Sequence, residues 1–412
     1  MDKTNLFFNN QLFPTEIPFP HPESFKFTFI DLFAGIGGFH LAMDELGGKC
    51  VFASEIDPDA IDTYEQNFGM TPAGDITRID AKDIPKHDVL CAGFPCQPFS
   101  KAGKQKGFDD ETKGTLFFHI ERILQYHKTK YIVLENVRNL VSHDNGNTWK
   151  IIYSHLKKIG YRLTAHPLIL SPHHFGIPQL RERVVILGIY DPKNADQDLK
   201  IEFRELKKKE DCSLDSILET DVSERKYFLS KQEITEIETW NEFYQGIKET
   251  VIGFPLWAEY FSEISKPEIT SFPEWKKTFI QKNMLLYKNN KKFIDYWLKK
   301  HNYLDDFTPT MKKMEWQCGN KISSIWDGIM QKRPSGLRVK CPDCAPALVA
   351  IVQMPIIGKY KRRMTVREAA RLQSFDDRFI PNHNQHQAYK QFGNAVNVTV
   401  IKECARRLFE YE

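Results

Sequence analysis

Short apolar runs alternate with amphipathic segments along residues 27–190. Runs such as FTFIDL and KYIVLENV are typical of buried strands, and segments such as GTLFFHIERILQYH repeat their apolar residues at helical spacing. Strands separated by helices of this length predict a parallel sheet with helices on both faces. We therefore expect a doubly wound, Rossmann-like α/β domain.

The alternation stops after residue 190. Residues 191–340 contain scattered aromatic residues and one longer helical candidate, at about 275–300. Two regular segments follow, MTVREAARLQSF and NAVNVTVIKECARRLFEY, and both predict helices. The chain is therefore expected to comprise a first domain at 1–190 with an irregular arm at about 1–26, a second domain with an insertion at 191–360, and a C-terminal segment at 361–412.

Length and composition set broad limits on the class of protein. The chain has 412 residues, of which 41% are hydrophobic, so it can bury a large core. No apolar run approaches the roughly 20 residues of a membrane span, and the N-terminus does not have the pattern of a signal peptide. Eight scattered cysteines without an export signal are expected to stay reduced. These features predict a cytoplasmic protein without a membrane partner.

Although the net charge of the chain is only +3, acidic and basic residues are distributed unevenly along the second domain. Residues 191–270 carry 11 Lys and Arg against 19 Asp and Glu, whereas residues 271–340 carry 15 against 6. Aromatic residues are interleaved with the lysines of the basic stretch. Such a stretch can be a solvated lysine face or a nucleic-acid footprint, and the pattern alone leaves both open.

The stretch GFPCQPFS, residues 93–100, holds one cysteine between two prolines. Proline fixes its own φ and restricts the residue before it, so Pro95 to Pro98 cannot form a helix or a central strand. A buried structural thiol would not need this rigidity. The pattern therefore predicts a stiff turn that presents Cys96.

A glycine-rich turn, FAGIGGF at residues 33–39, lies between a predicted strand and a predicted helix. The dinucleotide fingerprint fits poorly because His40 stands at its third glycine position. Two acids, Glu55 and Asp75, follow later strands or segments and could bind an adenosine through its ribose and its amine. An acid-rich site favours a cationic ligand, S-adenosylmethionine, over NAD, although a tight turn for packing remains the alternative.

Taken together, these motifs resemble the bacterial DNA (cytosine-5) methyltransferase family. The matching stretches occur in the family's order, cover most of 28–190 and 361–400, and include DLFAGIGGFHLA, SEIDPDA, GDIT, AGFPCQPFSKAGKQKGFDD, LENVRNL, QLRERVVILG and YKQFGNAVNV. The resemblance implies a catalytic domain, a smaller target-recognition domain and duplex DNA as the substrate. It also implies a monomeric modification enzyme of a restriction–modification system, with no stable complex with a cognate endonuclease.

The resemblance also implies the catalytic residues. The thiolate of Cys96 would add to cytosine C6, which makes C5 able to accept a methyl group. Glu135, in the ENV stretch, would contact N3 and the exocyclic amine of the base. Arg183 would contact the base O2 and Arg181 would support the site. Arg181 and Arg183 lie two residues apart before or within a predicted strand, so their side chains are expected to point the same way.

The cofactor residues are assigned by motif position. Phe33 would stack on the adenine, the backbone of Ala34, Gly35, Ile36, Gly37 and Gly38 would lie under the methionine part, and the remaining contacts would come from Glu55, Ile56, Asp75, Ile76, Pro95, Leu116, Asn394 and Val396. No metal is expected. The stretch CPDC at residues 341–344 has metal-ligand spacing, with Cys318 upstream, but it lacks a second pair of ligands.

DNA contacts are assigned to two regions. In the family the lysine- and glycine-rich stretch at 100–114 serves as a lid over DNA, where a flipped-out base is held. The candidate DNA-binding residues are Gln97, Ser100, Lys104, Arg333, Arg338 and Lys340. Three rival hypotheses are a tRNA cytosine methyltransferase, a DNA-binding relative with an inactive site, and an NAD oxidoreductase.

Overall fold

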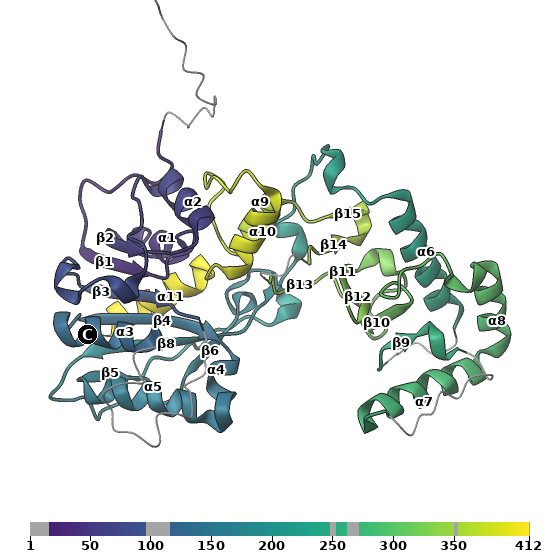
Figure 1. Cartoon of the computed structure of the whole chain (residues 1–412), viewed down its shortest axis with the longest axis horizontal. Coiled ribbons are helices and arrows are strands. Elements are labelled where there is room, and N and C mark those ends of the chain that lie inside the picture. The colour runs from purple at the N-terminus through teal and green to yellow at the C-terminus, as the bar shows by residue number, and fades with distance from the viewer. Residues whose placement is uncertain (1–15, 96–115, 248–252, 262–271, 350–352, 412) are drawn as a thin grey trace, which may run out of the picture. The chain divides into compact units, whose positions relative to one another are not determined.

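The computed structural model describes residues 16–95, 116–247, 253–261, 272–349 and 353–411 (Figure 1). The chain divides into two compact units. The first comprises Met1–Ser171, Glu182–Glu205 and Gln373–Glu412, and the second comprises Pro172–Arg181 and Leu206–Leu372. The first unit is therefore discontinuous in sequence, and its last segment is Gln373–Glu412.

The first unit contains a mixed sheet with the strand order β2-β1-β3-β4-β8-β5, and β6 also pairs with β8. Its strands are β1 (Phe27–Leu32), β2 (Gly48–Ser54), β3 (Val89–Gly93), β4 (Tyr131–Val137), β5 (Tyr161–Leu163), β6 (Leu168–Leu170) and β8 (Arg183–Tyr190). Its helices are α1 (Gly38–Asp44), α2 (Pro58–Phe68), α3 (Leu116–His127), α4 (Asn139–Ser142), α5 (Asn147–Lys158), α10 (Gln385–Asn394) and α11 (Val398–Phe409).

The direction of the strands differs between the two halves of this sheet. Strands β1 to β4 are parallel, as predicted. Strand β8 is antiparallel to both β4 and β5, so the prediction of a wholly parallel sheet is wrong for this half. The reason is that α5 leads to β5, a strand of three residues that is too short to be recognised from its apolar pattern. Strand β8 then returns between β4 and β5.

Helices cover both faces of the sheet. On one face, Ile30, Leu90 and Ile132 of neighbouring strands form a buried cluster with residues of α3 and α5. Helix α11 contacts β4, β8 and α1 without contributing to that cluster. The doubly wound α/β architecture is therefore confirmed (Figure 1).

The second unit contains a six-stranded sheet with the order β15-β14-β11-β12-β10-β9. The strands of this sheet are β9 (Leu256–Trp257), β10 (Lys313–Gln317), β11 (Ile329–Arg333), β12 (Gly336–Lys340), β14 (Ile356–Ile357) and β15 (Arg362–Arg363). A separate two-stranded sheet pairs β7 (Gln179–Leu180) with β13 (Ala345–Pro346). The helices of the second unit are α6 (Lys231–Gly246), α7 (Glu274–Asn289), α8 (Lys291–Lys300) and α9 (Val366–Leu372). The single helix predicted at about 275–300 is two helices, because the backbone leaves the helical region at Asn290 (φ −117°, ψ 22°).

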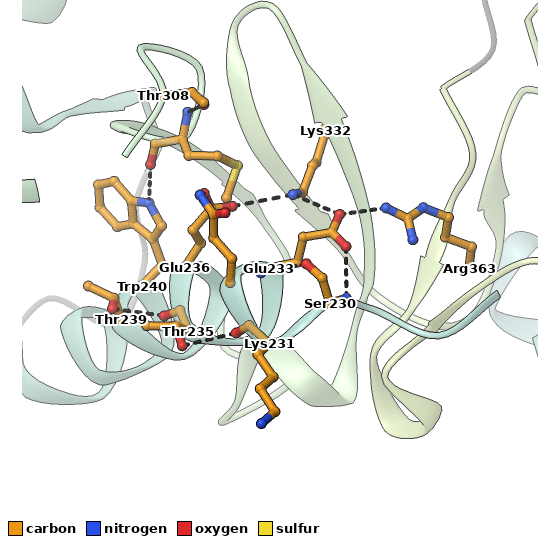
Figure 2. A network of polar contacts seen from close by, with 12 residues as sticks. Ser230, Lys231, Glu233, Thr235, Glu236, Thr239, Trp240, Thr308, Lys332 and Arg363 are labelled. Atoms are coloured by element: carbon orange, nitrogen blue, oxygen red, sulfur yellow. Dashed lines mark hydrogen bonds and ion pairs between the residues drawn. The ribbon is translucent and has the colours of Figure 1, made fainter. Parts of the chain in front are cut away.

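A polar network joins α6 to the sheet of the second unit (Figure 2). One oxygen of Glu233 accepts hydrogen bonds from Lys332, at 3.0 Å, and from Arg363. The other accepts the backbone N–H of Ser230 at 3.0 Å, which closes a capping box at the start of α6. Lys332 also donates to Glu236 at 3.3 Å. The network therefore ties one helix to strands β11 and β15.

Replacing Glu233 with glutamine is expected to lower the free energy of unfolding by about 1–3 kcal/mol at pH 7. Burial disfavours the charged carboxylate, but the hydrogen bonds from Ser230 and Lys332 and the charge of Arg363 outweigh it, and the pKa of Glu233 is lowered. A lowered pKa in the folded state gives stability that is present above the unfolded value, about 4.3, and is lost as the pH falls through the folded value. The difference should therefore shrink below about pH 4.

Urea unfolding of the wild type and the variant at pH 7 and at pH 3.5 measures this effect. Glu224→Gln is the matched control, because Glu224 forms one exposed ion pair with Lys226. A Glu233→Gln penalty that is the same at both pH values would show that the ionised carboxylate is not its source.

Candidate active site

The glycine turn between β1 and α1 requires glycine at two positions. Gly37 has a φ of +86°, and a Cβ built on it would lie 2.2 Å from the ring of Phe68. A Cβ on Gly38 would lie 2.7 Å from the side chain of Val396, in the C-terminal segment. Gly35 has a φ of +55° and nothing within 4 Å of an added Cβ. The turn is therefore closely packed behind Gly37 and Gly38 and open at Gly35.

Glu55, directly after β2, holds this turn. One of its carboxylate oxygens accepts the backbone N–H of Gly35 at 2.8 Å. The other accepts the N–H groups of Ile56 and Asp57 at 2.7 and 2.9 Å. A carboxylate offers about four acceptor positions, so Glu55 retains capacity for a ligand hydroxyl. The side chain of Ile56 is 70% exposed beside it.

Asp31, which the sequence analysis did not single out, lies on β1 and is fully buried. Burial and the nearby charge of Glu55 raise the pKa of Asp31 well above its usual range. Burial therefore favours the neutral form of Asp31. No local motif distinguishes such an acid from a strand-end ligand, which is why the sequence alone could not place it.

The second predicted cofactor acid, Asp75, follows a bridge that pairs Ser54 with Ala73 alongside the end of β2. Asp75 accepts the N–H of Thr77 at 2.9 Å, and this hydrogen bond lowers the pKa of Asp75. The side chain of Ile76 is 3% exposed and belongs to the core.

The other predicted cofactor residues differ in exposure. Phe33 is half-buried with a φ of +57°, and Ala34 and Ile36 are buried. Pro95 and Asn394 are exposed, and Leu116, the first residue of α3, is half-buried. Val396 is brought to the turn by the contact with Gly38 described above. Their cofactor roles remain predictions.

Two predicted catalytic side chains meet at the edge of the sheet. Glu135, on β4, and Arg183, the first residue of β8, form an ion pair with 3.0 Å between Oε1 and Nε. Both are sheltered, with 12% and 22% of their side chains exposed. The antiparallel pairing of β4 with β8 places Arg183 opposite Val137, two residues beyond Glu135. Arg183 also donates to the carbonyl of Glu182 at 2.9 Å.

Arg181 does not share a strand with Arg183, because β7 ends at Leu180 and β8 begins at Arg183. The expectation that Arg181 and Arg183 point the same way because they alternate along one strand is therefore wrong. Arg181 is 3% exposed and donates to the carbonyl of Leu348 at 2.7 Å within the second unit. Its role in the site stays a prediction.

Asn136 is a second polar residue that the sequence analysis missed. It follows Glu135 on β4, and its side chain is 2% exposed. Its amide donates to the carbonyl of Phe94 at 2.8 Å, and its oxygen accepts the N–H of Val137 at 2.8 Å. An asparagine directly after the acid of a predicted strand is the sequence signal that could have identified Asn136. The hydrogen bond from Asn136 therefore holds the backbone at Phe94, directly after β3 and two residues before Cys96 in the sequence.

Four predicted residues, Cys96, Gln97, Ser100 and Lys104, lie outside the described residues. Among the predicted DNA-binding residues that are described, Arg338 forms an ion pair with Glu315 at 2.6 Å across paired strands. Lys340 is half-buried, and burial lowers its pKa, with the charges of Arg338 and Lys209 adding to the effect. Arg333 is half-buried at the end of β11.

The described residues contain no group of three or more His, Cys, Asp and Glu side chains suited to a metal ion. Cys341 donates toward the carbonyl of Cys318, whereas Cys344 approaches that of Lys209. The helices in the described ranges include none with the length and apolar character of a membrane span.

Solved structures share this fold. The methyltransferase EhMeth of Entamoeba histolytica matches with a TM-score of 0.52 and 18% identity, over 93% of this chain and 98% of that chain. The Dnmt2 methyltransferase of S. pombe matches with a TM-score of 0.51 and 16% identity, over 93% and 98%. At these identities the likeness concerns the fold alone.

Curated relatives match over nearly the whole chain. The type II methyltransferase M.AluI of Cellulosimicrobium cellulans is 31% identical over 92% of this chain and 91% of its own length. M1.ScrFI of Lactococcus lactis subsp. cremoris is 36% identical over 97% and 82%. M.HpaII of Haemophilus parainfluenzae is 36% identical over 93% and 90%.

A family model described as C-5 cytosine-specific DNA methylase matches residues 27–410. The matched range contains the glycine turn, the Glu135–Arg183 pair and nearly all of both compact units. The chain belongs to the C-5 cytosine-specific DNA methylase family.

Proposed function

We propose that this DNA cytosine-5 methyltransferase uses S-adenosylmethionine to methylate a flipped-out cytosine in a specific duplex site, through a covalent bond between Cys96 and C6. The observation that carries the proposal is the sheltered ion pair of Glu135 and Arg183 at the end of β4. In register with Glu135 lies Gly93, the last residue of β3, three positions before Cys96. The ends of two adjacent parallel strands thus supply the acid and lead to the thiol.

The residues around the glycine turn fit a cationic adenosine ligand. Gly35 has open space at its Cβ position, Glu55 retains acceptor capacity for the ribose, and Asp75 offers a carboxylate for the adenine amine. When bound, S-adenosylmethionine supplies a methyl group on a sulfonium centre. The backbone at residues 34–38 and the side chain of Phe33 would hold it.

The side chains then act on the cytosine. The sulfur of Cys96 forms a bond to C6, which gives C5 the electron density it needs to take up a methyl group. Glu135 holds N3 and the exocyclic amine, and Arg183 holds O2, while Arg181 supports the site. S-adenosylhomocysteine would be the product of the methyl donor once C5 carries the methyl group. The C5 proton then passes to water, and the bond between sulfur and C6 breaks, which restores the thiolate. The base must leave the stack for this attack.

The two units take different roles in this proposal. The first unit carries Glu135, Arg183 and the cofactor turn, and the second selects the DNA target. One chain supplies every proposed catalytic residue, and we propose that the enzyme acts as a monomer. Similarity to type II methyltransferases over most of their length supports a place as the modification enzyme of a restriction–modification system.

Incubation with labelled S-adenosylmethionine and either duplex DNA or tRNA tests the proposal. We expect label in duplex DNA, and bisulfite sequencing should map 5-methylcytosine to one cytosine of a short recurring sequence. Label in tRNA alone would contradict the proposed substrate. Label in DNA at adenine or at cytosine N4 would contradict the proposed chemistry.

A further inference from the structure

Aromatic rings and lysines gather on one edge of α7 in the second unit. We call Trp257, Tyr260, Trp275, Phe279, Lys276 and Lys282 the α7 aromatic face. The ring of Phe279 lies 6.0 Å from that of Trp257 and 6.2 Å from that of Trp275, both edge-to-face. Tyr260 lies 5.8 Å from Trp257. Trp275 is 60% exposed, which is unusual for so large an apolar side chain.

A buried hydrogen-bond cluster keeps these rings in place. Asn283 of α7 is fully buried and accepts the backbone N–H of Trp257 at 2.8 Å. Its amide donates to the carbonyls of Pro255 at 3.0 Å and Phe279 at 2.9 Å. These bonds fix β9 against α7. These hydrogen bonds therefore hold the ring of Trp257 and the rings of α7 on joined elements.

The lysines of this face are available to a partner. The ammonium of Lys282 lies 5.8 Å from the ring centre of Phe254 and 5.9 Å from that of Phe279. Lys276 lies 3.7 Å from the ring centre of Phe272. Within the described part of the chain, neither ammonium forms an ion pair with a carboxylate; the acid of α7, Glu274, pairs with Lys277. Helix α7 carries four lysines and this single acid.

Positive charge beside aromatic rings suits a polyanion that carries less polar surface between its charged groups. Duplex DNA has this chemistry, since phosphates alternate with deoxyriboses along each strand. The predicted contacts at Arg338 and Lys340 are less available, because the first is paired with Glu315 and the second is half-buried. Charge complementarity therefore favours the α7 aromatic face over the strand residues as a backbone contact.

We propose that the α7 aromatic face binds the sugar–phosphate backbone of the substrate duplex, with Lys276 and Lys282 on phosphates and Trp275 against a deoxyribose. The proposal rests on the proposed function, since it names a contact to that same substrate. Such contacts carry no sequence information, so they add affinity for DNA without choosing the target.

The test compares Lys276→Ala/Lys282→Ala with Lys288→Ala in the full-length protein. Lys288 is an exposed lysine nine residues beyond Phe279, so at about 100° per residue it lies on the side of α7 opposite the ring of Phe279. Anisotropy of a labelled duplex that contains the mapped methylation site gives Kd between 50 and 300 mM salt. The double variant should lower the slope of log Kd against log salt by about 2, while Lys288→Ala keeps the wild-type slope.

The Trp275→Ala variant is a second test of the proposal, because Trp275 is exposed and its replacement leaves the core intact. We expect Kd for the duplex to rise about fivefold, in the range for loss of an aromatic contact, with the same cytosine methylated. The loss should appear in KM for DNA rather than in kcat.

Wild-type salt slopes in the double variant, together with wild-type Kd in Trp275→Ala, would overturn the inference while leaving the proposed function intact. A wild-type protein that methylates tRNA and does not bind duplex DNA would overturn both. Weakened capture of a second protein with unchanged binding of duplex DNA would assign the face to a protein partner and overturn the inference alone.

Discussion

Replacing Cys96 with serine is expected to lower the rate of methyl transfer by about 10³-fold or more. Serine keeps the size and the hydrogen-bonding capacity of the side chain, but its hydroxyl is a far weaker nucleophile than a thiolate. Without addition to C6, the C5 carbon of cytosine has too little electron density to take up a methyl group. Binding of duplex DNA should stay within about threefold, because the substitution leaves Pro95 and Pro98 in place.

Trapping with 5-fluorocytosine in the target site separates addition from later steps. The wild type should form a bond between sulfur and C6 and should then stop, because C5 carries fluorine in place of the proton that must leave. The adduct survives denaturing electrophoresis as a protein–DNA band, and peptide mapping should place it on Cys96. The serine variant should give no band.

Cys341→Ser is the matched control, since Cys341 is a half-buried cysteine of the second unit with no role in the proposed chemistry. Its turnover should stay within about twofold of the wild type. Full turnover by the Cys96→Ser variant, or an adduct mapped to another cysteine, would remove the nucleophile assignment.

The sequence predicts most of the first unit because long apolar runs and amphipathic helices alternate there. Strands β1 to β4 have five to seven residues each, enough for their burial to be evident. Strands β5 and β6 have three residues each, and the direction of β8 depends on them. In the second unit, strands of two to five residues form a sheet through pairings that local patterns do not encode. The direction of β8 and the sheet of the second unit therefore depend on pairing between strands that are far apart in the sequence, which local patterns do not determine.

The same distinction applies to the candidate site. Glu55 was predicted because an acid directly after a strand is a local signal, whereas Glu135 was assigned through the family resemblance of the ENV stretch. In the structure Glu55 follows β2 and Glu135 lies near the end of β4. Arg181 donates a hydrogen bond to the carbonyl of Leu348, which lies 167 residues further along the chain. No local sequence pattern predicts this contact. The buried state of Asp31 likewise depends on packing around the turn. The identity of a candidate site residue could be predicted from the sequence around it, whereas the distant residues that contact it could not.

Replacing Glu135 with glutamine is expected to lower kcat by about 10²–10⁴-fold, the range for loss of a positioned acid or base. Glutamine keeps the shape of the side chain but cannot share a proton with N3 of the base, so addition of the thiolate to C6 loses its electrostatic support. KM for DNA should change little, because one base contact is a small part of the interface. Single-turnover kinetics with saturating DNA measures the effect on the chemical step.

Arg183→Lys tests whether the ion pair positions Glu135. Lysine keeps the charge but loses the planar fork that places Nε 3.0 Å from the Glu135 carboxylate, so we expect a loss of about 10–100-fold in kcat. If the two residues act as a unit, the double variant should be little slower than Glu135→Gln alone. The matched control is Arg162→Ala on β5, since Arg162 is 18% exposed and forms an ion pair with Asp191 at 3.7 Å on the same sheet. Fully additive losses would mean that Arg183 acts on the base independently of Glu135, and an equal loss of kcat in the control would assign the effect to stability of the sheet.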